Sequence, residues 1–263
     1  MRPPWVILSN RALRARFQDL EAGDLLLVPL SLKRGEEGLF LDLAARGVEA
    51  FPSLLSQALS RSKCLQAAVL KEFMPPHTLV VYDRHDLLRA VALYERLGIE
   101  EVVTKEDRAN CGLGIHLWSR VEEVYNHAGG GPLAYPFVLQ PRFRKLRDIR
   151  VILLGDYEEA YLRENPYGFR NNLYFGAEAR PYELSEAERD FCLRALARGR
   201  FPYAHLDLIY TETGGPYLSE INLRGGLKGA RVDRKTYEKK LSALREAFLK
   251  DWLSHHPEAQ LIE

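Results

Sequence analysis

Three oxygen-bearing side chains lie close together in the last third of the chain. Asp207 sits in an apolar run, and Glu220 and Asn222 follow after a turn at residues 213–215. The two glycines of that turn favour a tight hairpin, and residues two apart on a strand point to the same face. Carboxylate and amide oxygens without His or Cys are a ligand set that suits Mg²⁺ or Mn²⁺. The pattern therefore predicts a divalent metal site on a hairpin.

A glycine-rich stretch, residues 224–229, follows the second strand of this hairpin at once. Glycine allows the backbone to approach a bound molecule closely. The alternative interpretation is structural: these residues would be ordinary polar positions and a loop on a half-exposed hairpin. Asp207 alone does not distinguish the two interpretations, whereas the three side chains together with the glycines favour the metal site.

A lysine before a second glycine-containing loop indicates phosphate binding. Lys105 ends an apolar run, and Gly112 and Gly114 lie in the loop that follows it. A cation beside free backbone N–H groups is a typical contact for phosphate oxygens. The alternative is a solvent-exposed lysine at the end of a strand, which is common on protein surfaces.

Three folding units are predicted to position these residues: a small N-terminal α/β unit (1–60), a middle unit (61–131) and a C-terminal unit (132–263). Short apolar runs predict buried strands, and Ser185 with Glu188 and Ser119 with Glu122 have the spacing of helix capping boxes. The predicted strands cover residues 5–8, 25–30, 48–52, 79–82, 101–105, 115–118, 136–140, 149–154 and 159–163.

The composition is that of a globular protein without a strong bias. The 263 residues are 46% hydrophobic and 28% charged, and the formal net charge is +1. This balance argues against general affinity for nucleic acid or an anionic membrane. Three cysteines without metal-type spacing favour a reducing cytosol. No apolar run has the length of a membrane span, so a cytoplasmic location is predicted.

In order and spacing, these motifs resemble the ATP-grasp superfamily, in particular RimK-like, LysX-like and glutathione synthetase-like carboxylate–amine ligases. The resemblance covers roughly residues 60–230, and its most specific part is an Asp, a hairpin, and then Glu-x-Asn. It implies an α+β ATP-grasp fold that holds ATP between two α+β subdomains. It also implies that Asp207, Glu220 and Asn222 bind Mg²⁺, or Mn²⁺ in its place.

The resemblance extends to further residues, each with an implied role. Lys63, Lys105, Gly112 and Gly114 match segments that contact phosphate, and the run from Gln140 to Phe143 matches a strand that presents its backbone to adenine. Asp148 matches an acid that binds the ribose. Arg150, Arg170 and Asn172 match positions that stabilise the transferring phosphoryl group. The sequence departs from the family at Ser62, where an acid is usual, and in the residues between Lys105 and Gly112. The residues implied to contact ATP are Lys63, Lys105, Gly112, Gly114, Gln140, Phe143 and Asp148.

The resemblance implies an ADP-forming carboxylate–amine ligase that acts through an acyl phosphate. Its substrates would be a small carboxylate and an amine, such as an amino acid or the end of a peptide or carrier protein. Two alternatives stay open, namely a kinase that stops at phosphoryl transfer and a non-catalytic nucleotide-binding or interaction module. The basic residues from Arg142 to Arg150 also allow a solvated surface or a small nucleic-acid patch, although no nucleic-acid partner is expected. A homo-oligomer is possible, because a second subunit could complete the substrate site.

Overall fold

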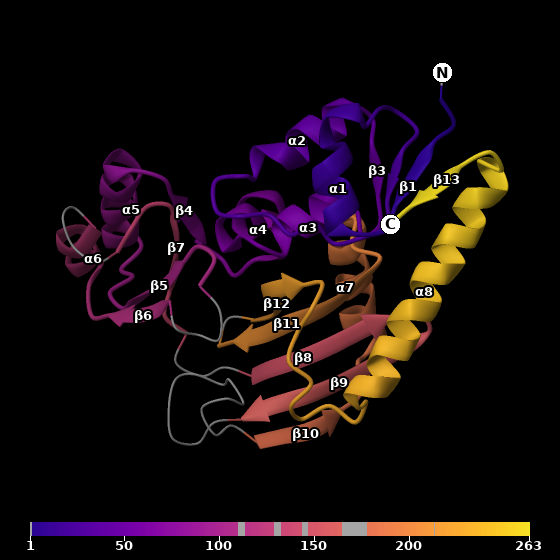
Figure 1. The fold of residues 1–263 in the computed structure, drawn as a ribbon. Coiled ribbons are helices and arrows are strands. Elements are labelled where there is room, and N and C mark those ends of the chain that lie inside the picture. Colours follow the sequence, from indigo (N-terminus) through magenta and orange to yellow (C-terminus); the bar gives the residue numbers. More distant parts are fainter. Residues whose placement is uncertain (1, 110–113, 129–132, 144–146, 165–177, 213) are drawn as a thin grey trace.

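A computed structural model describes residues 2–109, 114–128, 133–143, 147–164, 178–212 and 214–263. Within these ranges the strands form three separate sheets, which Figure 1 shows as an upper, a left-hand and a lower group. Helices cover each sheet, and the α+β class that the sequence predicted is confirmed.

The N-terminal sheet has four parallel strands in the order β13-β1-β2-β3. Apolar residues of the strands and helices, such as Ile7, Leu26 and Leu43, are completely buried between them. The strands are β1 (Trp5–Ile7), β2 (Leu25–Leu26), β3 (Glu49–Ala50) and β13 (Gln260–Ile262), and the helices are α1 (Asn10–Arg16), η1 (Phe17–Asp19), α2 (Gly38–Ala45) and α3 (Leu54–Leu59).

The middle sheet has the order β4-β7-β5-β6, with antiparallel pairing throughout. Its core includes Tyr94 and Phe137, both fully buried. Near its last helix, the Ser119 N–H donates to Glu123 (3.2 Å) rather than to the Glu122 that the capping-box spacing predicted. The strands are β4 (Leu79–Val81), β5 (Val102–Glu106), β6 (Ile115–Trp118) and β7 (Phe137–Pro141), and the helices are α4 (Lys63–Val69), η2 (Lys71–Phe73), α5 (Arg84–Arg96) and α6 (Val121–Ala128).

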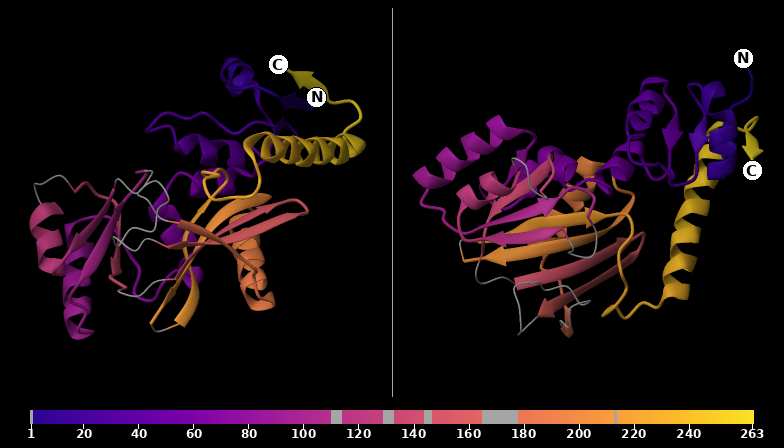
Figure 2. Two further views of the ribbon diagram at one scale, coloured as in Figure 1. Left: turned by 90° about the horizontal axis from the view of Figure 1, so that it is seen from below. Right: turned by 60° about the vertical axis from the view of Figure 1, so that its left-hand side comes forward.

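The C-terminal sheet is antiparallel, in the order β10-β9-β8-β11-β12. Its two helices lie on opposite faces of the sheet (Figure 2), and the first begins with the predicted capping box of Ser185 and Glu188. The strands are β8 (Arg147–Leu154), β9 (Tyr157–Glu164), β10 (Glu178–Tyr182), β11 (Tyr203–Thr211) and β12 (Gly214–Asn222), and the helices are α7 (Glu186–Gly199) and α8 (Arg234–His255).

Two strands lie outside the units to which their sequence positions assigned them. Strand β7 falls within residues 132–263, yet it pairs with β4 and β5 of the middle sheet. Strand β13 follows the long helix α8, which returns the chain to the N-terminal sheet, where β13 pairs with β1 (Figure 1). The sequence did not predict either pairing, because both partners lie far away along the chain.

Buried contacts join the three sheets. The Gln66 side chain on α4 accepts a hydrogen bond from the Ile221 N–H of β12 (3.0 Å) and donates to the Ile221 carbonyl (2.9 Å). Phe51, next to β3, stacks on Phe248 of α8 with ring centroids 4.4 Å apart. In the described part of the chain, no helix combines the length and the apolar character that crossing a membrane requires.

Candidate functional site

The hairpin of β11 and β12 places two of the predicted metal ligands directly opposite each other. Asp207 pairs with Glu220, and His205 pairs with Asn222 one step along the same face. Gly214 and Gly215 have φ angles of +136° and +144° at the start of β12, a conformation that glycine adopts readily. The hairpin that the sequence predicted is therefore present, and it gathers the three side chains along one face.

Two arginines from the neighbouring strands hold the Asp207 carboxylate. Arg150 on β8 donates to it from Nε and from Nη2, the latter over 3.1 Å, which makes a two-pronged contact. Arg163 on β9 lies 3.1 Å from the same carboxylate through Nη2, and it also donates to Asp148 through Nε (2.8 Å). Asp207, Arg150, Arg163 and Asp148 thus form one continuous charge network across three strands.

Burial and these arginines set the protonation of the two acids. Burial alone would raise the pKa of Asp207, but the charges of Arg150 and Arg163 outweigh it and lower that pKa to about 2. For Asp148, burial dominates over the attraction of Arg163 and raises the pKa to about 6. Asp207 is therefore the permanently charged acid of the network, as a metal ligand must be.

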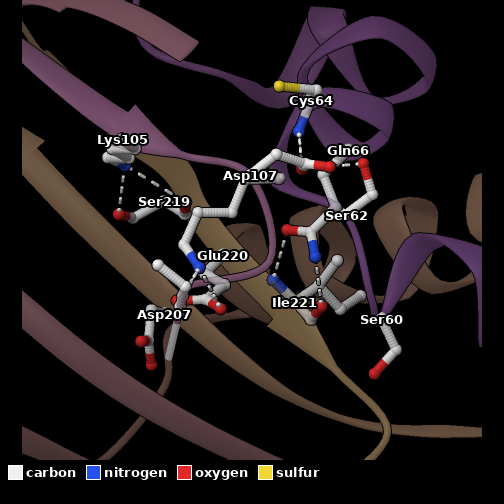
Figure 3. Close-up of polar contacts among 12 residues, drawn as sticks. Ser60, Ser62, Cys64, Gln66, Lys105, Asp107, Asp207, Ser219, Glu220 and Ile221 are labelled. Carbon is white, nitrogen blue, oxygen red and sulfur yellow. Dashed lines mark hydrogen bonds and ion pairs between the residues drawn. The ribbon is translucent and has the colours of Figure 1, made fainter. Parts of the chain in front are cut away.

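Two lysines of the middle unit, Lys63 and Lys105, approach the hairpin. Figure 3 labels Lys105. The Lys63 ammonium, at the start of α4, lies 3.6 Å from a carboxylate oxygen of Glu220 and donates to the Ala109 carbonyl. The Lys105 ammonium, on β5, donates to the hydroxyl of Ser219 over 3.2 Å. Burial lowers the pKa of Lys105 to about 8, and the charge of Glu220 partly counteracts this. The structure thus brings Lys63 to the predicted metal ligand Glu220 and Lys105 to Ser219, the residue next to it.

Asp107 is a site residue that the sequence analysis missed. Its carboxylate accepts hydrogen bonds from the Ser62 hydroxyl (2.9 Å) and the Cys64 N–H (3.0 Å), which join the end of β5 to the start of α4 (Figure 3). Ser62 is a departure from the ATP-grasp pattern that the sequence resembles, in which an acid is usual, so this departure was the available signal. In this chain the acid beside Lys63 comes from a different element.

The glycine-rich segment after β12 packs against the charge network. A Cβ atom added at Gly225 would lie 2.5 Å from His205 Nδ1 and 2.7 Å from Arg150 Nη1, whereas one added at Gly226 would meet no atom of the described residues within 4 Å. The segment is fastened downstream, where the buried Glu159 carboxylate accepts from the Arg231 N–H (2.6 Å). Gly225 is therefore required by the close approach of the backbone to the site.

His205 is a buried residue of the same face. Its Nε2 lies 3.0 Å from the Tyr237 hydroxyl of α8, and its Nδ1 has no hydrogen-bond partner among the residues that the structure describes. Burial, followed by the charge of Arg150, lowers the pKa of His205 to about 4. The imidazole is thus neutral at pH 7 and supports Gly225 and the network by packing.

The predicted nucleotide contacts on the middle unit are only partly arranged for that role. Gln140 is buried, its side chain donates to the Thr78 hydroxyl (2.8 Å), and its backbone lies in β7 opposite Val103 of β5. The Gly114 carbonyl accepts from the Glu106 N–H (2.8 Å) and closes the loop after β5. Phe143 is half-buried beyond β7. The Asp148 carboxylate accepts from Arg163 and does not stand free for a ribose.

Three predicted residues, Gly112, Arg170 and Asn172, lie outside the residues that the structure describes. Their roles stay predictions. In the described ranges, no group of three or more His, Cys, Asp and Glu side chains is arranged to hold a metal ion. The predicted set therefore depends on the Asn222 amide as its third donor. Two carboxylates and one amide oxygen along one hairpin face fit Mg²⁺ or Mn²⁺, which prefer oxygen ligands.

Comparison with known proteins identifies the family and the fold. The family model of the RimK-like ATP-grasp domain matches residues 58–242. A ribosomal protein bS6–L-glutamate ligase of Escherichia fergusonii is 34% identical over 87 residues, which are 32% of this chain and 29% of that protein. A probable alpha-L-glutamate ligase of Picosynechococcus sp. is 29% identical over 191 residues, which are 68% of this chain and 61% of that protein. The chain thus spans less than two thirds of the length of either relative.

Solved structures share the fold at low sequence identity. D-cycloserine synthetase DcsG has a TM-score of 0.58 at 18% identity, over 82% of this chain and 78% of that one. A RiPP-associated ATP-grasp ligase of Chryseobacterium gregarium, solved with ADP and a leader and core peptide, has a TM-score of 0.57 at 17% identity, over 81% of this chain and 67% of that one. The fold and the hairpin site define an ATP-grasp protein. Within that class, the chain belongs to the RimK-like ATP-grasp family.

Proposed function

We propose that this protein is an ATP-dependent, ADP-forming ligase that joins a carboxylate to an amine through an acyl phosphate. The observation that carries the proposal is the convergence of four cations on the Asp207–Glu220 hairpin face. Lys63 and Lys105 come from the middle unit, and Arg150 and Arg163 come from the C-terminal sheet. Cations from two units around paired carboxylates are suited to a metal–polyphosphate complex.

The side chains of the proposed site form two groups, namely oxygen ligands for a metal and cations for the phosphates. Asp207, Glu220 and Asn222 would hold Mg²⁺, which would neutralise charge on the phosphate oxygens. Lys63 and Lys105 would bind the phosphates, and Arg150 would stabilise the phosphoryl group during transfer. The reaction requires no nucleophile from the protein, so its main contributions are position and charge.

The proposed reaction has two steps. An oxygen of the substrate carboxylate attacks the γ-phosphorus of ATP, the bond to the bridging oxygen breaks, and ADP leaves. The amine then attacks the carbonyl carbon of the acyl phosphate, inorganic phosphate leaves, and the amine nitrogen loses a proton. Since the two sequence relatives are named as glutamate ligases, we propose that an amino acid is one of the two substrates, and that the other is a small molecule or the end of a peptide.

The test is a calorimetric titration with Mg²⁺ and a non-hydrolysable ATP analogue. The wild type is expected to bind with micromolar affinity, about −8 kcal/mol, and Glu220→Gln is expected to bind at least about tenfold more weakly. Glu95→Gln, on the exposed side of α5, is the control and should match the wild type.

Absence of binding to the wild type would contradict the proposal and favour a non-catalytic module. If binding is found, ADP and phosphate release should be measured with amino-acid substrates. Release of ADP without phosphate would indicate a kinase instead of a ligase.

A further inference from the structure

The predicted metal ligands are already paired with cations of the chain itself. Asp207 Oδ1 accepts from Arg150 Nε, and Asp207 Oδ2 lies 3.1 Å from the Nη2 atoms of both Arg150 and Arg163. Glu220 has the Lys63 ammonium at 3.6 Å. Each carboxylate therefore has a positive partner at the position where a divalent cation would have to bind.

A metal ion and the arginine fork require the same oxygen atoms. A carboxylate offers about four lone-pair positions, and the Asp207 carboxylate has contacts with three nitrogen atoms from two guanidinium groups. The side chain is only 13% exposed, so neighbouring backbone and side chains restrict approach from other directions. Coordination of a metal by Asp207 thus requires at least one arginine to release it.

Arg150 is the arginine that is free to leave. Arg163 has a second acid, because Asp148 accepts from its Nε over 2.8 Å. In the described part of the chain, Asp207 is the only acid that forms an ion pair with Arg150. Arg150 contacts Asp207 through Nε and Nη2, and its Nη1 atom takes no part in this two-pronged contact. Nη1 lies beside Gly225, which has no side chain there. Exchange at Asp207 would therefore release Arg150 and leave Arg163 paired.

We propose that Arg150 is an internal competitor of the divalent cation for Asp207, so that metal and nucleotide bind by exchange of partners. This inference rests on the proposed function. The metal would coordinate the Asp207 carboxylate, and the released Arg150 guanidinium would pair with the phosphates of the nucleotide. The metal alone binds weakly, because it would leave Arg150 buried without a partner. By linkage, nucleotide and metal each strengthen the binding of the other by the same factor.

The first experiment measures Mn²⁺ binding alone, from the free Mn²⁺ signal in electron paramagnetic resonance, to wild type and to Arg150→Gln. Removal of the competitor is expected to tighten Mn²⁺ binding at least about tenfold, which corresponds to about 1.4 kcal/mol. The matched control is Arg147→Gln, which removes the same charge from the same strand. The Arg147 guanidinium lies 3.8 Å from the ring of Tyr210 and is exposed, so its loss should leave the affinity for Mn²⁺ nearly unchanged.

The second experiment repeats both titrations with a non-hydrolysable ATP analogue present. The analogue should strengthen Mn²⁺ binding to the wild type by a larger factor than in Arg150→Gln, in which the exchange is lost. Arg150→Lys, which cannot form the fork, should show intermediate Mn²⁺ affinity and serves if the glutamine variant does not fold. The double variant of Arg150→Gln and Asp207→Asn should lose the tighter Mn²⁺ binding that Arg150→Gln alone produces.

Three outcomes would overturn the inference. One is equal tightening by Arg150→Gln and Arg147→Gln, which would reduce the effect to net charge. Another is an Mn²⁺ affinity in Arg150→Gln equal to that of the wild type, while metal and nucleotide still bind the wild type together. That result would contradict the exchange and would not affect the proposed function. The third is absence of Mn²⁺ binding to the wild type and to both Arg150 variants, with and without the analogue, which would remove the metal site and the proposed function as well.

Discussion

At the scale of single residues, Asp207 is the centre of the site. The sequence predicted it as a metal ligand, and the structure adds two arginines that hold its carboxylate. An isolated buried carboxylate would be unstable, and here the ion pairs keep it charged. The same contacts change what a substitution at this position is expected to do, because they make Asp207 important for stability as well as for binding.

Asp207→Asn is expected to lower the free energy of unfolding by about 3 kcal/mol, because it leaves Arg150 buried without a charged partner. Chemical denaturation measures this, and turnover should also fall sharply. In the double variant with Arg150→Gln, the loss should be smaller than the sum of the single losses. An unchanged unfolding free energy in Asp207→Asn would contradict the observed network.

The two glycines after β12 allow a matched comparison. Gly225→Ala is expected to destabilise the fold by about 1–3 kcal/mol through overpacking, because its Cβ would contact the buried ring of His205 and the guanidinium of Arg150. Gly226→Ala has open space at its Cβ and should change thermal stability little. Equal effects of the two substitutions in thermal unfolding would argue against this packing.

At the scale of elements, the contact between the end of β5 and the start of α4 is decisive. These two elements carry Lys105 and Lys63, and nothing in the local sequence determines the distance between them. Asp107 joins the elements by accepting from Ser62 and from the Cys64 N–H. We infer that Asp107 positions the two lysines for one polyphosphate without touching it.

Asp107→Ala should therefore weaken binding of the ATP analogue severalfold, while the loss of its hydrogen bonds with the Ser62 hydroxyl and the Cys64 N–H costs about 1 kcal/mol of stability. Calorimetry and denaturation measure the two effects. Asp156→Asn, in the exposed turn between β8 and β9, is the control and should have neither effect. A purely structural role for Asp107 would lower stability and leave the affinity for nucleotide unchanged.

At the scale of the whole molecule, the three sheets are held in place by contacts between distant parts of the sequence. Gln66 is 2% exposed and makes hydrogen bonds to both backbone groups of Ile221 and to the Leu59 carbonyl. Phe51 and Phe248 stack where helix α8 passes the N-terminal unit. The hairpin of the C-terminal sheet is thereby fixed against the helix that carries Lys63.

Gln66→Leu retains most of the volume, but it leaves the Ile221 N–H and carbonyl without their Gln66 partner. It also removes one of the two hydrogen bonds that the Leu59 carbonyl accepts, the other coming from the Ser62 N–H. It is expected to lower the free energy of unfolding by about 2–4 kcal/mol. Gln18→Leu, at an exposed position, should have little effect. Denaturant unfolding of both variants measures this, and comparable losses in the two would contradict the role of Gln66 as the joint between the units.

Some features were determined by the sequence alone, because they depend on neighbours along the chain. The hairpin at Gly214 and Gly215 follows from the backbone freedom of glycine, and the capping box of Ser185 and Glu188 follows from helix geometry. The one-face placement of Glu220 and Asn222 follows from the strand repeat of two. The order of the motifs sufficed for the ATP-grasp fold, which the family match confirmed.

Other features were decided only by the tertiary structure, because they depend on residues that are distant in sequence. The pairing of β13 with β1 and of β7 with β4 depends on where helices and loops return the chain, which local patterns do not encode. The fork of Arg150 on Asp207 arises because β8 and β11 are neighbours in register. Sequence patterns identify which residues can bind a metal or a phosphate. Strand register decides which of these residues pair with one another in the protein without a bound metal or phosphate.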